Sequence, residues 1–504
     1  MNKKIQKIIS VILSSAMLGS IAMFNASAAG DIDYKITSTY ENVNWDTYKQ
    51  YKTDLHNHTV ASDGHMTKTE NIEAHYNSNF DIQAITDHGT IDYGWDTNSA
   101  NKIVHVFVNM KNKINPISAT GIAANGNKYT YNGTYYTQYA SDGSALHQMM
   151  RVPFGNEQNP TSFNNAHVCS WFVDYGNELL GGTSDYETIV KNVDALGGLC
   201  VINHPGEYTG ARHAKNFATA YNTKNIKYRY YVDKFENLLV KYPNSLIGLD
   251  INSKGDSRTR FDRKLWDTLL QRVVPQGRNV FGIATTDAHN FDVIDTGYTM
   301  MCMPEQTADA LKTAMKTGAF FACSYRDGSP VEINAWANEL KEAGVGLELA
   351  DKLAETYEKI CIEEKENGEQ DTKFTFDTSA AVPAITKVSV DDAEDTISIN
   401  TKNAYLVHWV ADGKIIATGN TIDLDDYSGK IGSYVRAEVI GEGGVMYTQP
   451  FTLEYDGAPT AQTDNSFYDF GGIVSAICDT VVKLLGLVLK YTGIVPLLWY
   501  ISLQ

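Results

Sequence analysis

Short runs of histidine and carboxylate residues in the first part of the chain supply side chains of the kind that bind divalent cations. Asp54-Leu55-His56-Asn57-His58 is followed by Ser62-Asp63-Gly64 and then by Thr86-Asp87-His88. Alternate side chains of an extended strand point to the same face, so His56 and His58 would direct two imidazoles at one metal. A lone His-x-His pair means little because histidines are common near turns, but here further runs of the same kind follow.

Each later run comes directly after a stretch that has the pattern of a buried strand. Three such stretches precede candidate ligands: 81–86 before His88, 199–203 before His204-Pro205, and 280–286 before Asp287-Ala288-His289. Helical patterns at 184–196 and 260–274 lie between them, so strands and helices alternate. Reactive groups of α/β barrels lie at the carboxyl ends of the strands, which predicts that these side chains converge.

Length and charge limit the classes of protein that fit. A chain of 504 residues is too long for one hydrophobic core, so we expect two or three domains. The formal net charge of −18, with no basic run beyond the extreme N-terminus, argues against nucleic acid as a partner. An acidic surface with a metal-filled pocket is compatible with a small phosphorylated substrate.

The N-terminus has the pattern of a signal peptide, residues 1–29. Lys3, Lys4 and Lys7 precede the apolar stretch 8–23 and the small-residue site Ala26-Ser27-Ala28, so we expect an exported protein, secreted or associated with the cell surface. A retained transmembrane anchor is the alternative, but the apolar stretch is short for a bilayer span. The six cysteines are scattered; we expect buried thiols, with disulfides left open.

The second half of the chain has a different pattern. A charged helical pattern at 335–366 precedes strand-like runs at 387–390, 396–399, 405–410, 414–417, 434–440 and 445–453, which predict a small all-β sandwich. The apolar residues 470–503 are interrupted by Lys490 and Pro496. These interruptions favour an interfacial or protein-docking helix over a true membrane span, so this segment is where we expect any membrane or cell-surface contact. The alternative is a helix that packs on the catalytic domain.

These patterns predict the domain organisation. Residues 30–330 form an α/β catalytic domain, 331–456 a helical connector and β-sandwich-like domain, and 457–504 a linker and apolar C-terminal segment. Deleting the chain after Ser329 is expected to leave catalysis on small substrates intact.

The ordered motifs resemble the PHP (polymerase and histidinol phosphatase) family of metal-dependent phosphoesterases. The resemblance covers residues 51–324 and includes a closing helix pattern at 307–318 followed by Ala319-Phe320-Phe321-Ala322. It implies a distorted (β/α)7 barrel and a hydrolase with two or three divalent metals, zinc, manganese or iron.

The family also needs a glutamate that bridges two metals and a histidine shortly after it. Residues 116–123 lie where that strand might be expected but carry alanine in place of the carboxylate, whereas Pro153-Phe154-Gly155-Asn156-Glu157 has the family-like order. We choose Glu157, with His167 after it. The intervening residues 129–141 then form a hairpin-like insertion that could roof the pocket.

The resemblance implies a ligand set of nine residues. His56, His58, Glu157 and Asp287 would hold one metal, Glu157, His167 and His204 the second, and Asp63, His88 and His289 the third. The implied nucleophile is a metal-bound water, with Asp287 and Glu157 as catalytic carboxylates. Asp54 and Asp87 adjoin ligands but face the other way in a strand, so we expect them to orient the histidines, with simple capping as the alternative.

Substrate contacts are expected from the loops beside the ligands. Arg212 and Lys254 are the residues we select to bind a phosphate group, although charged loop residues are often simply solvated. Two other functions remain open: an amidohydrolase-type metal hydrolase acting on C–N bonds, and a non-catalytic surface binding module. Amidohydrolase-type enzymes commonly use a barrel lysine to bridge their metals, and we find no lysine at a matching strand end. A binding module is disfavoured because nine polar ligands that converge without metal would be electrostatically costly.

Overall fold

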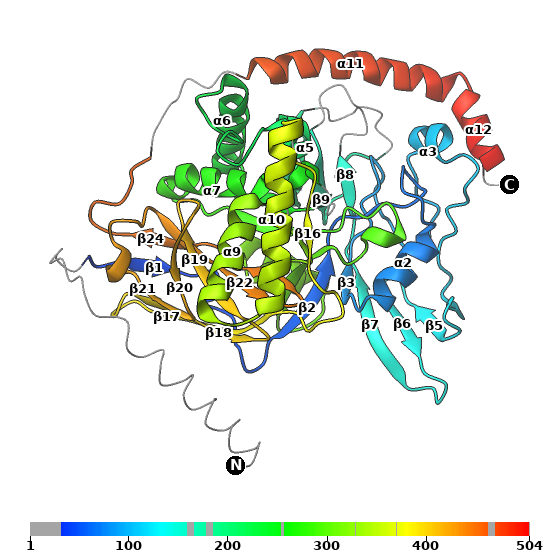
Figure 1. Ribbon diagram of the computed structural model, residues 1–504. Coiled ribbons are helices and arrows are strands. Elements are labelled where there is room, and N and C mark those ends of the chain that lie inside the picture. The colour runs from blue at the N-terminus through cyan, green and yellow to red at the C-terminus, as the bar shows by residue number, and fades with distance from the viewer. Residues whose placement is uncertain are drawn as a thin grey trace.

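The computed structural model shows a mixed α/β molecule in which helices lie around the sheets in separate groups (Figure 1). The residues that the structure describes are 32–158, 166–177, 185–253, 257–327, 329–368, 370–461 and 469–502. The expected signal peptide lies outside these residues.

The smaller sheet has the strand order β12-β11-β10-β9-β8. Its strands are β8 (Asn156–Gln158), β9 (Val168–Trp171), β10 (Leu199–Ile202), β11 (Leu246–Asn252) and β12 (Phe281–Ala284). β10, β11 and β12 run parallel, whereas β9 is antiparallel to both of its neighbours. Every residue of β10 and β11 is buried, as expected for apolar strands that are covered on both faces.

Helices pack on this sheet through apolar stripes. The helices are α4 (Tyr186–Ala195), α5 (Pro205–Thr209), α6 (Ile226–Lys241) and α7 (Asp262–Val273). In α7 the buried residues Leu265, Leu269 and Val273 recur every four positions and therefore lie on one face. Their cluster includes residues of β10, β11 and α4, so the helical layer and the sheet share one core.

The larger sheet begins with the strands that carry the first motifs. β2 (Lys49–Asp54) runs parallel to β3 (Ile82–Gln83), and β3 runs parallel to β7 (Ala145–Arg151). On the other side, β13 (Gly297–Met303) and β14 (Phe320–Ser324) continue the sheet antiparallel. α2 (Lys68–Asn77) follows β2 and begins with a capping box between Thr67 and Glu70, and α8 (Ala308–Thr317) joins β13 to β14.

The two sheets approach each other at the ends of their strands. Isolated bridges join Asn57 to Ala288 and His88 to Glu157, and the Thr299 hydroxyl donates to the carbonyl oxygen of Ala284 at 2.9 Å. The described strands form four hydrogen-bonded sheets, and the two that meet here remain separate sheets, so closure into a (β/α)7 barrel stays a prediction.

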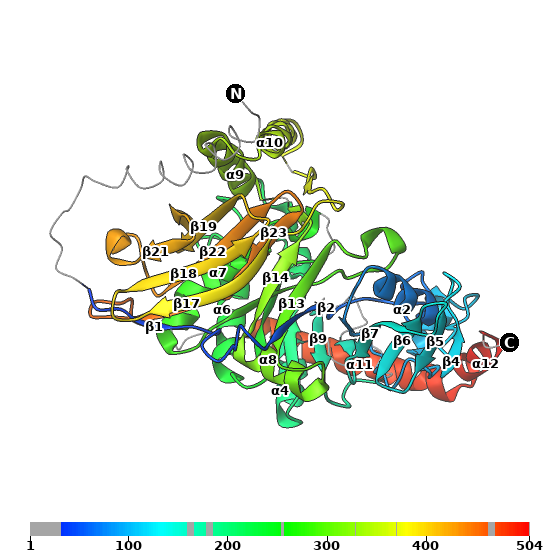
Figure 2. The same cartoon turned by 90° about the horizontal axis from the view of Figure 1, so that it is seen from below.

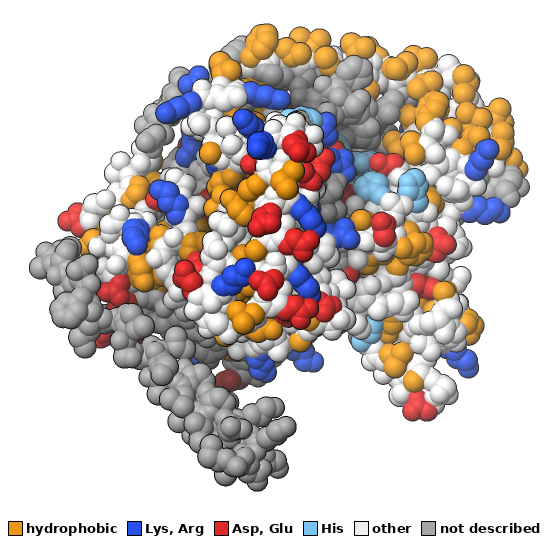
Figure 3. Space-filling view, viewed as in Figure 1, with side chains coloured by type: hydrophobic (Ala, Val, Ile, Leu, Met, Phe, Trp, Pro, Cys, Tyr) orange, Lys and Arg blue, Asp and Glu red, His pale blue; other side chains and the backbone are white. Residues whose placement is uncertain are grey.

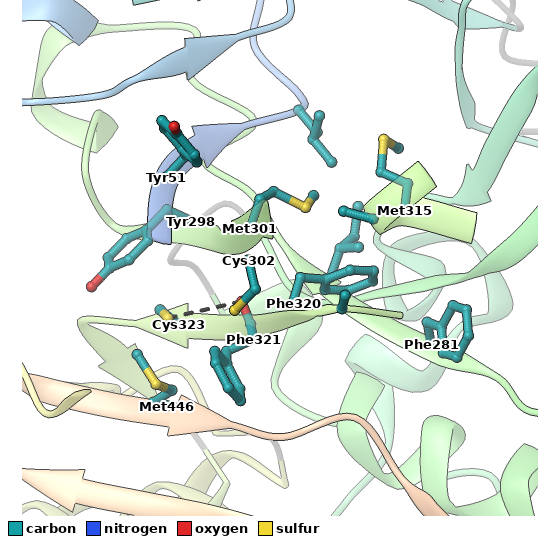
Figure 4. Packing of buried hydrophobic residues seen from close by; sticks show 14 of the residues in the cluster. Tyr51, Phe281, Tyr298, Met301, Cys302, Met315, Phe320, Phe321, Cys323 and Met446 are labelled. Atoms are coloured by element: carbon teal, nitrogen blue, oxygen red, sulfur yellow. Dashed lines mark hydrogen bonds between the residues drawn. The ribbon is translucent and has the colours of Figure 1, made fainter. Parts of the chain in front are cut away.

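A buried cluster connects the first half of the chain to the second half (Figure 4). Met301 and Cys302 of β13, Phe320 and Phe321 of β14, and Met315 of α8 pack together. Met446 belongs to the same cluster and is paired in register with Cys323 of β14. The large sheet therefore runs without a break across the predicted boundary at residue 330.

The second half forms two further sheet regions (Figure 2). One is the three-stranded sheet β17 (Ala384–Asp391), β18 (Thr396–Lys402) and β21 (Thr421–Asp423). The other extends the large sheet with β19 (Leu406–Ala411), β20 (Lys414–Thr418), β22 (Tyr434–Gly441), β23 (Gly444–Tyr447) and β24 (Phe451–Glu454). β1 (Lys35–Thr37) pairs with β24, so the first described residues join this half and not the domain to which we assigned them.

Several predicted elements are subdivided in the structure. The helical pattern at 335–366 forms α9 (Pro330–Ala343) and α10 (Leu347–Asn367), because Gly344 and Gly346 adopt positive φ between them. The run at 445–453 is two strands, β23 and β24, separated by Gln449 and Pro450. The insertion at 129–141 belongs to a meander of β4 (Thr120–Ile122), β5 (Lys128–Tyr131), β6 (Tyr135–Tyr139) and β7.

Side chains of the second half also complete the first half. Gln449 donates to the carbonyl oxygen of Gly282 in β12 and accepts from its N–H, at 2.8 and 2.9 Å. Arg436 of β22 binds Asp267 of α7 with two bonds of 2.8 Å and Glu438 with one of 2.7 Å. Deleting the chain after Ser329 would remove these partners, so the structure no longer supports the expectation that catalysis survives it.

The last two helices lie along the outside of the molecule (Figure 1). α11 (Phe470–Tyr491) begins beside α6 and runs along the upper edge above α5 and β8, and α12 (Ile494–Ser502) packs on α3 (Lys102–Val108). Among the described residues no single helix has the length and apolar character to cross a membrane. One bent pair, 480–491 with 494–501 at 63°, meets the criterion together.

The Arg436 ion pairs predict a test of the joint between the two halves. Replacing Arg436 with Met leaves two buried carboxylates unpaired, so the free energy of unfolding should fall by about 3–5 kcal/mol. Arg272→Met, in the same helix as Asp267, is the matched control, because the Arg272 side chain is 30% exposed in its ion pairs with Asp233 and Glu236. Its cost should stay below about 1 kcal/mol. Equal losses for the two variants in urea unfolding would contradict this account.

Candidate metal centre

The nine predicted ligands come together at the junction of the two sheets. His56 and His58 follow β2, His88 follows β3, Glu157 lies in β8, and His204 follows β10. The remaining four are Asp63, His167, Asp287 and His289. Their donor atoms form three overlapping groups in which all atoms lie within 4.8 Å of one another.

Glu157 lies at the centre of this cluster. Its Oε2 atom is 3.3 Å from His56 Nε2, 3.2 Å from His58 Nε2 and 3.2 Å from His88 Nδ1. Its Oε1 atom is 3.0 Å from His167 Nδ1 and 3.2 Å from His204 Nε2. Both carboxylate oxygens thus face imidazoles, as expected for a carboxylate that bridges two cations. Ala123, the competing position, is a buried residue beside the end of β4.

The grouping of the ligands differs from the one that the resemblance implies. The structure groups His56 and His204 with Glu157 and Asp287, whereas His58 joins Asp63, His88 and His289. A third group contains His88, Glu157 and His167. Relative to our assignment, His204 takes the place of His58 in the first group, and His58 joins the third. His88 takes the place of His204 beside Glu157 and His167. His58 Nδ1 faces Asp63 at 3.7 Å, while its Nε2 faces Asp287 at 3.1 Å, so its ring lies between two groups.

The donor set fits divalent cations. His56 Nε2 and His58 Nε2 lie only 3.1 Å apart, and both face Glu157 Oε2 and Asp287 Oδ1 within 3.3 Å. Protons can satisfy only some of these converging lone pairs, whereas a cation placed among them satisfies all four atoms. Mixed nitrogen and oxygen donors of this kind suit zinc, manganese or iron.

The backbone is strained at two of the ligands. His204 and Asp287 have φ of 25° and 44°, values that residues other than glycine rarely adopt. Such conformations cost about 1–3 kcal/mol each and persist only where the surroundings hold them. The chain therefore turns sharply after β10 and β12 to direct these two side chains into the cluster.

Asp54 fastens two of the ligand runs to each other. Its buried carboxylate accepts from Thr286 Oγ1 at 2.7 Å, His75 Nε2 at 2.9 Å and the backbone N–H of His56 at 3.2 Å. The residues after β2 and those after β12 thus share one carboxylate. We expected Asp54 to orient a histidine ring; it holds the backbone instead, and His75 of α2 is its further partner.

Asp87 holds the loop that carries Asp63. It accepts from Thr59 Oγ1 at 2.7 Å, from Thr59 N at 2.7 Å and from Ser62 Oγ at 2.6 Å. Asp63 follows directly in this loop. Asp87 therefore positions Asp63 by holding this loop. We had expected it to orient a histidine.

A cavity of about 380 Å³ opens over the cluster. Five ligands, His56, His58, Glu157, His204 and Asp287, have side chains no more than 1% exposed, whereas Asp63 and His289 are 35% and 25% exposed at its mouth. The wall also includes Glu207, Tyr208 and Arg258, and Arg258 Nη1 donates to Glu207 Oε1 at 2.6 Å. The space suits a small substrate.

The predicted substrate contacts have different outcomes. Arg212 bonds to His213 at 2.9 Å and is not among the described residues that line the cavity; Lys254 lies outside the described residues. Arg258, which sequence reasoning did not select, lines the cavity in its place. Its only sequence signal was its position in the loop after the strand-like run 246–251. The insertion at 129–141 likewise contributes no described residue to the lining.

Burial and charge set the protonation of the ligands. Burial lowers the pKa of His88 to about 3, against the opposing charges of Asp63 and Glu157, so its imidazole is neutral and can act as a ligand. Burial alone would raise the pKa of Glu157, but the surrounding histidines hold it well below its usual value. Burial also lowers the pKa of His58, but Asp287 and Glu157 outweigh it and raise this pKa to about 10.

Comparison with known proteins gives little beyond this geometry. No protein-family model matches the chain, and no curated protein matches it. Among solved structures, it is similar to a two-domain protein from Bacteroides vulgatus ATCC 8482 containing a predicted PHP-like metal-dependent phosphoesterase, with 13% identity and a TM-score of 0.35 over 87% of this chain and 97% of the other. PsfC from Pseudomonas syringae PB-5123 has 12% identity and a TM-score of 0.29 over 53% and 87%. Scores this low support no inference about function.

The raised pKa of His58 predicts that metal binding depends on pH. A cation must displace the proton that His58 holds near neutrality, so the metal affinity should rise with pH. We expect about a tenfold gain per pH unit for each proton displaced. Competition with a chromophoric chelator between pH 6 and 8 measures this slope. A metal affinity that does not change over this range would contradict the assignment of His58 as a ligand.

The position of Glu157 predicts a second result. Glu157→Gln should remove at least one metal per chain, because a neutral amide cannot balance two dications. Glu73→Gln is the matched control, since Glu73 is also buried but accepts a bond from the Ala124 N–H outside the cluster. Elemental analysis of both variants measures the metal content. Full metal content in Glu157→Gln would show that this carboxylate bridges nothing.

Proposed function

We propose that the protein is an exported metal-dependent phosphoesterase that hydrolyses a phosphomonoester or a small phosphodiester. The observation that carries this proposal is the carboxylate of Glu157, whose Oε2 faces His56 of one ligand group and whose Oε1 faces His167 of another. Two or three divalent metals, zinc, manganese or iron, fit the donor set. The N-terminal sequence supports export.

Divalent cations in such a centre polarise a phosphoryl group and activate a water molecule. The residues of the chain hold the cations and position the substrate. Glu157 and Asp287 hold the buried part of the cluster, and Asn203 Nδ2 donates to Glu157 Oε1 at 2.8 Å and fixes the carboxylate. Asp63 and His289 lie at the mouth, where a substrate enters.

The cavity wall contains a cationic side chain that suits an anionic substrate. Arg258 is the only Arg or Lys among the described residues of the lining, and its pairing with Glu207 holds its guanidinium beside the cluster. A guanidinium binds phosphate oxygens well because its donors form a planar fork. No described lining residue is a lysine of the kind that bridges metals in amidohydrolase-type enzymes, which supports phosphoester over C–N bond hydrolysis.

A substrate panel tests the proposal. Metal-stripped protein is reloaded with zinc, manganese or iron and assayed on p-nitrophenyl phosphate, bis(p-nitrophenyl) phosphate and a p-nitroanilide amide. We expect metal-dependent release of nitrophenol from a phosphoester and none of nitroaniline from the amide. His289→Ala should lower the rate at least about a hundredfold, because it removes a ligand at the mouth.

His213→Ala is the control, because His213 is an exposed residue outside the cavity lining, and it should keep the wild-type rate. Metal-loaded protein that is inert on both phosphoesters, or that cleaves only the amide, would contradict the proposal.

A further inference from the structure

The outer face of the two C-terminal helices is apolar and open to solvent. In α11 and α12 the exposed side chains include Ile473, Ile477, Val481, Leu484, Val488 and Tyr491, which are 46–80% exposed. Their spacing of three and four residues places them on one face of the helix. Figure 3 shows the resulting band of hydrophobic side chains along the upper edge of the molecule.

The opposite face of α11 already rests on the protein. Val482 and Gly486 are buried and Leu489 is half-buried, again at helical spacing. A surface helix normally turns an apolar stripe inward and a polar face to water. Here the face turned to water is apolar as well. A continuous exposed apolar patch marks an interaction surface.

Both ends of this pair of helices are anchored. Asp469, just before α11, accepts from Tyr230 at 2.6 Å and pairs with the buried Lys234 of α6 at 2.9 Å. At the other end Trp499 packs edge-on against His105 of α3, with ring centroids 5.3 Å apart. The apolar face is therefore held outward by contacts at each end, and does not fold back onto the protein.

The anchors also relate this face to the metal centre. α3 comes after the loop that begins at His88, and α6 packs on α5, which contributes Glu207 and Tyr208 to the cavity wall. Figure 1 shows α11 passing over α5 and β8 between these two anchors. A surface that covers the band would thus lie on the side of the molecule where the cavity loops are found.

We propose that the outer face of α11 and α12 docks on the surface of a lipid bilayer that contains anionic lipids. α11 is about 33 Å long at 1.5 Å per residue, and Figure 1 shows it as a straight outer edge, which suits a planar surface better than a partner's groove. The exposed residues of these helices also include Phe470, Tyr491 and Tyr500, aromatic side chains of the kind that membrane–water interfaces favour.

Charge complementarity selects the anionic lipid. Lys227 and Arg229 are exposed on α6 beside Tyr230, which bonds to Asp469 at the start of α11. These cations accompany the apolar band in a chain whose formal net charge is −18. Basic residues beside an apolar helix strengthen its binding to negatively charged leaflets. This inference does not rest on the proposed phosphoesterase activity.

Vesicle flotation tests the docking. The full chain is mixed with vesicles of phosphatidylcholine alone or of phosphatidylcholine with phosphatidylglycerol, and the floated fraction is measured. The double variant Ile477→Asp with Leu485→Asp disrupts the band. Its matched control is Ile122→Asp with Ile362→Asp, because these side chains have the same exposed fractions, 64% and 54%, in β4 and α10. The N-terminal apolar stretch is common to all three proteins and cancels in the comparison.

We expect the wild type and the control to float with the phosphatidylglycerol vesicles and the band variant to bind at least about tenfold more weakly. Equal flotation of the band variant, or none by the wild type, would overturn the proposal. Equal binding to both vesicle types would overturn the part that concerns anionic lipid. Retention on the vesicles after an alkaline carbonate wash would indicate a membrane-spanning segment and would overturn the proposal. A dimer that only the band variant loses would indicate that a second copy covers the band, and would overturn it too. Hydrolysis of soluble p-nitrophenyl phosphate should be the same in all three proteins.

Discussion

Imidazoles from five histidines surround the buried carboxylate of Glu157, and most of the structure around the junction of the sheets serves to keep them there. A carboxylate this deeply buried is stable only where positive charge or strong donors compensate for its lost hydration. The histidines come from segments that follow β2, β3 and β10 or precede β9, so no single element can supply the site. The positions of all these strand ends must be correct together, within the few tenths of an ångström that metal coordination tolerates.

Carboxylates that do not belong to the ligand set provide this accuracy. Asp54 connects the residues after β2 to Thr286, next to Asp287, and Asp87 holds the loop of Asp63. The second half of the chain contributes further, because Gln449 pairs with the backbone of β12 and β23 extends the sheet beside β14. The second half of the chain is thus part of the scaffold around the candidate metal centre, and a strained backbone such as that of His204 and Asp287 persists only where its surroundings hold it.

Local patterns predicted the ligands because strand alternation and strand ends are local properties. The alternation of His56 and His58 and the apolar run before His204 point to residues that the structure brings together. The choice of Glu157 rests instead on the resemblance in motif order. The division into groups could not be predicted, since it depends on which way each ring turns once the strands have met. The role of His75 and the position of Arg258 at the cavity arise from contacts between distant segments. The pairing of β14 with β23 is a contact of the same kind, and a boundary chosen from composition near residue 330 could not anticipate it.

Anomalous diffraction from crystals of the metal-loaded protein tests the central claim most directly, because it locates each cation independently of any activity. The account predicts at least two anomalous peaks, one among His56, Glu157, His204 and Asp287 and another among His58, Asp63, His88 and His289. Peaks that lie elsewhere, or a single peak that Glu157 does not contact, would contradict it.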